Sequence, residues 1–119
     1  MSAFNLNQVA FTATIMDVST AGSVYIPIPE GFAGRVVEIR TVLAGAIGTA
    51  DAVVTPSIGG VNMTNGAVTV AFTSSAAGDA DVSRPTGANE VAAGGVVKIT
   101  TSGASTNTVA LAVTVVITR

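Results

Sequence analysis

The sequence predicts an all-β protein, an antiparallel sandwich of about eight strands, and three observations favour it. Only 10% of the 119 residues are charged, and Val and Thr are plentiful, a composition typical of strands. Apolar and polar side chains alternate with a period of two in several segments. Gly, Asn, Asp and Pro separate these segments at short intervals, as turns between strands require.

The length allows one domain with a single core. Residues 1–8 show no periodicity and are expected to form an N-terminal arm, whereas residues 9–119 are expected to form the sandwich. Hydrophobic residues make up 49% of the chain but aromatic residues only 4%, so each core side chain buries little area. There is no Cys to form a disulfide. We therefore expect burial between subunits in a homo-oligomer, a trimer or alternatively a dimer.

The first two strands are predicted from alternation. Residues 9–16 place one apolar series on a single face: Val9, Phe11, Ala13 and Ile15. Residues 23–28, SVYIPI, do the same with Val24, Ile26 and Ile28. Pro27 cannot donate to a ladder, which favours an edge strand. Tyr25 lies out of phase with the apolar series, so we expect it to point outward.

A third strand is predicted over residues 34–45, GRVVEIRTVLAG. One face of it carries Val37, Ile39, Thr41 and Leu43, and the other carries Val36, Glu38, Arg40 and Val42. The charged side chains place the second series outward. We expect Glu38 and Arg40 to pair with Lys98 or Arg84, at about 0–1 kcal/mol for an exposed pair.

The middle of the chain is predicted to contain four shorter strands, over residues 52–58, 67–72, 79–84 and 94–101. Gly59-Gly60 indicates a hairpin after the first of them, and Gly94-Gly95 a hairpin turn before the last. Asn65-Gly66 suits a turn with positive φ at both central residues. Phe72, like Phe11, is in phase with apolar neighbours and is expected in the core.

The final strand, residues 108–118, is too short and too clearly alternating for a membrane helix. Its larger side chains share one face: Val109, Leu111, Val113, Val115 and Ile117. Such a long uncharged strand is a pairing hazard at a free edge, so we expect it inside a sheet, paired on both sides. An interior last strand pairing back toward the first favours a jelly roll; an immunoglobulin-like sandwich is the alternative.

The residue types needed for most catalysis are missing. Without His or Cys there is no imidazole base, thiol nucleophile or soft metal ligand, and we expect neither enzymatic activity nor a cofactor. Asp79 and Asp81 form the one paired-carboxylate motif. A weak calcium site is one interpretation, and an Asp-stabilised turn after residues 76–78 is the favoured one.

The net charge and the N-terminal sequence limit the classes of partner that we expect. The net charge is −2 and the five basic residues are scattered, which does not favour nucleic-acid binding. No basic segment followed by an apolar run precedes residue 11, so we expect no signal peptide and synthesis in the cytoplasm of a host cell. No membrane partner is expected.

Two segments resemble small jelly-roll proteins of tailed bacteriophages. They are IPEGFAGRVVEIRTVLAGAIGTADAVVTPSIGGVNMTNGAVTV and NEVAAGGVVKITTSGASTNTVALAVTVVITR, about two thirds of the chain. Their succession of Gly-containing turns and strands is similar to that of capsid decoration, or cement, proteins. The resemblance implies a structural virion protein that binds the outside of an assembled head through the major capsid protein and stabilises it.

Contacts with the capsid or between subunits are expected from exposed apolar side chains. Phe4 and Leu6 in the arm are candidates because they lie outside the strand pattern. Tyr25 is a third candidate, as an outward aromatic residue. A phage fibre or a receptor- or carbohydrate-binding sandwich module is the alternative function, although such modules usually present more exposed aromatic residues.

Overall fold

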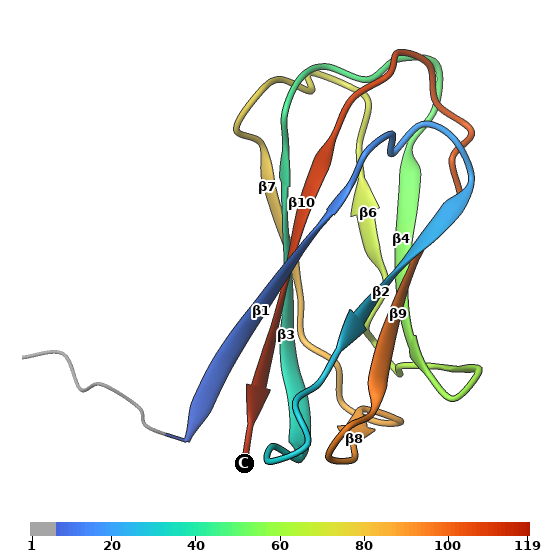
Figure 1. Ribbon diagram of the computed structural model, residues 1–119. Coiled ribbons are helices and arrows are strands. Elements are labelled where there is room, and N and C mark those ends of the chain that lie inside the picture. The colour runs from blue at the N-terminus through green and yellow to red at the C-terminus, as the bar shows by residue number, and fades with distance from the viewer. Residues whose placement is uncertain (1–6) are drawn as a thin grey trace, which may run out of the picture.

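The computed structural model describes residues 7–119, and in this range every regular element is a β-strand (Figure 1). The strands are β1 (Gln8–Ile15), β2 (Gly22–Pro27), β3 (Gly34–Leu43), β4 (Ala52–Ile58), β5 (Val61–Asn62), β6 (Val68–Val70), β7 (Ala80–Ser83), β8 (Glu90–Val91), β9 (Val96–Thr101) and β10 (Leu111–Thr118). All strand pairings among them are antiparallel.

The strands form two sheets packed as a sandwich. The first, here the β10 sheet, has the order β1-β10-β3-β7, with β8 also pairing β3. The second, the β9 sheet, has the order β2-β9-β4-β5, with β6 also pairing β4. Among the strands longer than two residues, each step along the chain crosses to the other sheet except the step from β4 to β6. This wrapping is that of a jelly roll, and the predicted fold is confirmed.

β10 lies inside its sheet, between β1 and β3, as its uncharged sequence predicts (Figure 1). Val113 is opposite Ala13 on one side and Thr41 on the other. The four inward side chains of β10 are fully buried: Leu111, Val113, Val115 and Ile117. Every second residue of β10 therefore faces the core, and both of its edges are paired, so the strand is a central element of the domain.

β3 departs from the predicted alternation at its start. Val36 was expected outward, yet it is completely buried, as are Ile39 and Thr41 further along. The cause is an irregularity in the pairing with β10: Val116 is opposite Glu38, but the next residue, Ile117, is opposite Val36. The extra residue, Val37, is a β-bulge that reverses the phase of the strand before it. A period-two pattern cannot reveal a bulge.

Two predictions in the middle of the chain are wrong. Phe72 was expected in the core but is 39% exposed, because β6 ends at Val70 and the chain turns, with the Phe72 amide donating to Asp51 Oδ1 at 3.0 Å. At Asn65-Gly66 only Asn65 has positive φ, at 58°. Gly66 is needed for space instead, since a Cβ there would lie 2.8 Å from Pro56 Cγ.

The glycine pair before β9 forms a turn but not a hairpin. β8, which precedes it, pairs with β3 in the β10 sheet, whereas β9 belongs to the other sheet. Gly94 has a φ of 72°, and the Gly95 amide donates to the Ala92 carbonyl at 2.9 Å. The turn therefore carries the chain across the sandwich.

The core consists mainly of small aliphatic side chains, as composition predicts. Phe11 is half-buried against it and meets the Phe32 ring edge-on, with centroids 6.2 Å apart. Pro27 ends β2, which is an edge strand as expected. Thr41 is a fully buried polar residue in this core, and its Oγ1 has no hydrogen-bond partner.

Replacing Thr41 by Val is expected to stabilise the protein. A buried polar group without a partner costs about 1–3 kcal/mol, and Val has nearly the same shape. A gain of about 1 kcal/mol corresponds to a rise in melting temperature of roughly 3–5 °C for a domain of this size. Thermal unfolding followed by circular dichroism measures it. The control is Thr114→Val on β10, which removes a hydroxyl hydrogen-bonded to Thr12 Oγ1 at 3.0 Å and should not stabilise.

Candidate interaction surfaces

The outward side of the β10 sheet is a broad surface of small, uncharged side chains. The pairing register brings its members together across four strands. We call it the β10-sheet outer face, and its uncharged members are Ala10, Thr12, Thr14, Val42, Val82, Ala112, Thr114 and Val116. Glu38 and Arg40 also face outward here, opposite Val116 and Thr114. Val42 and Val82 are 39% and 40% exposed, large fractions for valines within strands. A surface of this kind suits contact with another protein.

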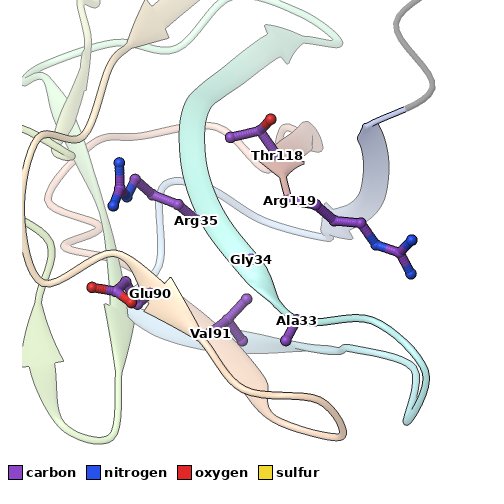
Figure 2. Close-up of a pocket in the computed structure, with 7 residues that line it drawn as sticks. All are labelled: Ala33, Gly34, Arg35, Glu90, Val91, Thr118 and Arg119. Carbon is purple, nitrogen blue, oxygen red and sulfur yellow. The ribbon is translucent and has the colours of Figure 1, made fainter.

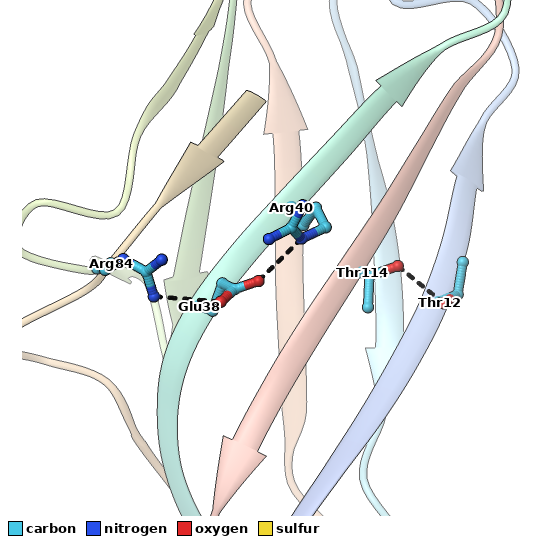
Figure 3. Close-up of polar contacts among 5 residues, drawn as sticks. All are labelled: Thr12, Glu38, Arg40, Arg84 and Thr114. Carbon is cyan, nitrogen blue, oxygen red and sulfur yellow. Dashed lines mark hydrogen bonds and ion pairs between the residues drawn. The ribbon is translucent and has the colours of Figure 1, made fainter. Parts of the chain in front are cut away.

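The charges on this face gather around one carboxylate (Figure 3). Glu38 accepts from Arg40 Nε at 2.9 Å and from Arg84 Nη1 at 3.2 Å, while its own side chain is only 18% exposed. The predicted pairing with Arg84 is confirmed, whereas Lys98 lies on β9 in the other sheet. Between β10 and β1, Thr114 and Thr12 share a hydrogen bond across the strands (Figure 3). The face therefore has one compact polar cluster beside a neutral area.

The outward side of the β9 sheet carries the predicted Tyr25. It is 62% exposed, so its outward direction is confirmed, and Lys98 Nζ lies 5.7 Å from its ring centroid. Val96, paired with Pro27 beside it, is 45% exposed. Tyr25 remains a candidate contact by exposure. The other two candidates, Phe4 and Leu6, lie outside the described residues.

The turn between β1 and β2 displays Met16, whose side chain is 77% exposed. Asp17 fixes this turn by accepting from Thr20 Oγ1 at 2.7 Å and from the Ser19 amide at 3.0 Å. These hydrogen bonds, above all the one from Thr20, hold the pKa of the Asp17 carboxyl below its usual value. The sequence predicted a strand over residues 9–16, but β1 ends at Ile15 and Met16 lies in the turn; Met16 was not predicted as a contact residue.

A hollow of about 400 Å³ lies where β3 starts and β10 ends (Figure 2). Gly34 lines it and lets the two strands approach closely, since a Cβ there would meet the Thr118 carbonyl. Figure 2 shows Arg35 and Arg119 pointing away from each other rather than into a shared centre. Arg119 instead donates to the Gly31 carbonyl at 3.0 Å and lies over the Phe32 ring. Glu90 also lines the hollow, but Figure 2 shows its side chain directed away from Thr118 and Arg119, so these groups do not converge on one point as catalytic groups would.

The Asp79 and Asp81 motif adopts the turn geometry favoured from the sequence. Asp79 Oδ2 accepts from the Ala76 amide at 3.0 Å and closes the loop before β7, while Asp81 lies within β7. Across residues 7–119, no three acidic, His or Cys side chains gather as metal ligands would. In the same range no helix is long and apolar enough to cross a membrane.

Topology explains which parts of these surfaces the sequence could reveal. Outward positions on β1 and β10 follow from alternation, and Val42 was correctly expected outward. Val82 was not identified, because β7 is four residues long and mixed in character. That β7 lies next to β3, and completes the face, depends on long-range pairing that no local pattern encodes.

The chain was also compared with known proteins. No family model matches it, and no curated protein matches it by sequence. Among solved structures, the chain is similar to one described as a cyanophage Pam1 capsid asymmetric unit, with 19% identity and a TM-score of 0.45. The match covers 93% of this chain and 81% of the other. These values are too low to assign a family or a function.

Proposed function

We propose that the protein is a non-catalytic structural component of a phage virion that binds the outside of the assembled capsid and stabilises it. The observation that carries the proposal is the β10-sheet outer face, whose small uncharged side chains lie beside one paired charge cluster and are backed by the buried inward side chains of β10. The resemblance of residues 28–70 and 89–119 to decoration proteins supplies the class of partner.

The chemistry of the face supports a protein partner. Ala, Thr and Val side chains lose little conformational entropy when covered, so contact with a second surface costs less than it would for Lys or Glu. The charges nearby are already paired around Glu38. The net charge of −2 and the scattered basic side chains give no support for DNA as the partner.

Binding to an assembled lattice would stabilise it by mass action. A ligand that binds only the assembled state contributes RT ln(1 + [L]/Kd), about 2.7 kcal/mol per site at a hundredfold excess over Kd. A capsid presents many equivalent sites, so a modest affinity at each site adds up to substantial resistance to disruption.

Val42→Arg is expected to weaken capsid binding without unfolding the protein. Val42 lies on the β10-sheet outer face between Ala112 and Ala80 and is partly exposed, so Arg fits sterically but places a long charged side chain in the contact. We expect at least a tenfold loss of affinity when purified protein is sedimented with undecorated heads of its own phage. Val61→Arg, also an exposed strand valine but at the far edge of the other sheet from Tyr25, is the matched control and should bind normally.

The same assay tests the arm. Deleting Ser2 to Leu6 removes Phe4 and Leu6 but keeps Asn7, whose carbonyl accepts from the Arg119 amide at 2.9 Å. Unchanged melting with weaker sedimentation would support an arm contact. If the heads sediment and the full-length protein stays in the supernatant at every concentration, the proposal fails. The fibre or receptor-binding module then becomes the better explanation.

A further inference from the structure

β1 leaves one edge of the β10 sheet open. It is the end strand of the order β1-β10-β3-β7, and no strand in the described part of the chain pairs with its other side. Figure 1 shows β1 along one side of the sandwich, with no labelled strand beyond it. An open edge presents a row of backbone N–H and C=O groups that can pair with another strand.

The register shows which backbone groups face this edge. The Arg119 amide donates to the Asn7 carbonyl, and residues 7 and 119 continue the β1–β10 register, so this position is a hydrogen-bonded pair. In an antiparallel ladder such pairs alternate along the strand. The odd-numbered residues of β1 therefore bond to β10. The outward donors and acceptors belong to Gln8, Ala10, Thr12 and Thr14.

β1 lacks the features that normally protect an edge. Its eight residues, QVAFTATI, contain no charge, no Pro and no Gly, and its pairing with β10 has no bulge. The other edge strands differ. β2 carries Pro27, β7 is four residues long and carries Asp81, and β5, β6 and β8 have two or three residues. Among the described edges, β1 alone combines eight residues with no bulge, no Pro and no charge.

We propose that this edge pairs with β1 of a second copy of the chain, antiparallel about a two-fold axis at Phe11. With the axis there, Ala10 is opposite Thr12 of the second copy, and Gln8 is opposite its Thr14. Every outward group of β1 is then used, in about eight N–H···O bonds, two for each hydrogen-bonded pair. With Gln8–Ile15 alone, any other two-fold register leaves some of these groups without a partner.

The charges and the size of the contact favour a second copy as the occupant. A two-fold interface places the same surface on both sides, so a strand without charge meets no like charge. Typical protein interfaces contain about 10 ± 5 direct hydrogen bonds, and the backbone ladder alone supplies about eight of them. The two β10 sheets would become one continuous sheet, and their neutral outer faces would join. The inference does not depend on capsid binding.

Ala10→Pro is the variant that tests this edge. The Ala10 amide points away from β10, so Pro removes no bond of the domain itself, while its ring blocks an incoming strand. Ala10→Ser keeps the amide and is the matched control. Thr12→Lys, at an exposed position, blocks the edge by charge in case the Pro variant folds poorly.

Sedimentation velocity without capsids, at micromolar concentration, provides the readout. We expect wild type and Ala10→Ser at twice the 11.7 kDa chain mass, and Ala10→Pro and Thr12→Lys as folded monomers. Hydrogen exchange should show slow amides at Gln8, Thr12 and Thr14 only in the dimeric proteins. A wild-type monomer, a wild-type trimer, or a folded Ala10→Pro variant that stays dimeric would each overturn the proposal.

Discussion

Val113→Asp is expected to leave the protein unfolded or insoluble. Val113 is fully buried at the middle of β10, between Ala13 and Thr41 on the neighbouring strands, and no cationic group lies opposite it in either pairing. Burying an unpaired carboxylate costs several kcal/mol even after the group takes up a proton. A domain of this size has a total stability of about 5–15 kcal/mol. Soluble yield and far-ultraviolet circular dichroism measure the loss.

Thr114→Asp, one residue further along, is the matched control for this substitution. Thr114 faces outward and is opposite Arg40 in the register, so the new carboxylate stays hydrated beside a positive charge. We expect a folded protein with a melting temperature close to that of the wild type. A Val113→Asp variant that melts near the wild-type temperature would mean that the facing of β10 is wrongly assigned.

Gly103→Ala is expected to destabilise the domain strongly by separating two loops at one end of the sandwich. Gly103 has a φ of 70°, and a Cβ there would meet the Ala21 amide nitrogen and lie 2.9 Å from the Thr20 carbonyl carbon. Thr101 Oγ1 donates to the Val18 carbonyl at 2.8 Å across the same contact. These neighbouring atoms belong to the backbone, which cannot move aside as the end of a flexible side chain can. The overlap and the left-handed φ together should cost about 3–5 kcal/mol.

Gly59→Ala separates the two causes of that loss. Gly59 has a φ of 60°, but a Cβ there has nothing within 4 Å. We expect a cost of only about 1 kcal/mol, from the left-handed conformation. Urea unfolding of both variants gives the comparison. Equal losses in the two proteins would show that the close approach of the loops does not matter for stability.

The sequence was most informative where one face is buried and the strand is regular. The alternation of Leu111, Val113, Val115 and Ile117 predicted both the facing of β10 and its interior place, since an uncharged strand of that length needs two neighbours. Pro27 similarly indicated the edge position of β2. In both cases the physical requirement is local, so a single segment contains the necessary information.

The sequence was least informative where the backbone changes phase or the chain crosses between sheets. The bulge at Val37 reversed the facing of Val36, and the end of β6 exposed Phe72 although both fit a period of two. Gly94-Gly95 has the composition of a hairpin turn yet joins strands of different sheets. These outcomes are decided by pairing between residues distant in sequence.

The interaction surfaces were only partly accessible in the same way. The outward direction of Tyr25 and the neutral outward residues of β1 follow from alternation. Their assembly into the β10-sheet outer face needs the order of four strands, and the open edge of β1 needs the knowledge that no strand follows it within the described range. The arm candidates Phe4 and Leu6 stay predictions.

Electron cryomicroscopy of undecorated heads, imaged before and after mixing with the purified protein, tests the central proposal most directly. Capsid decoration predicts new density of the size of this sandwich at symmetry-related positions on the outer surface, with the β10-sheet outer face toward the shell. The Val42→Arg protein should leave these positions empty, and the Val61→Arg protein should fill them. An unchanged outer surface after mixing at saturating concentration, or density confined to a tail or fibre, would contradict the proposal.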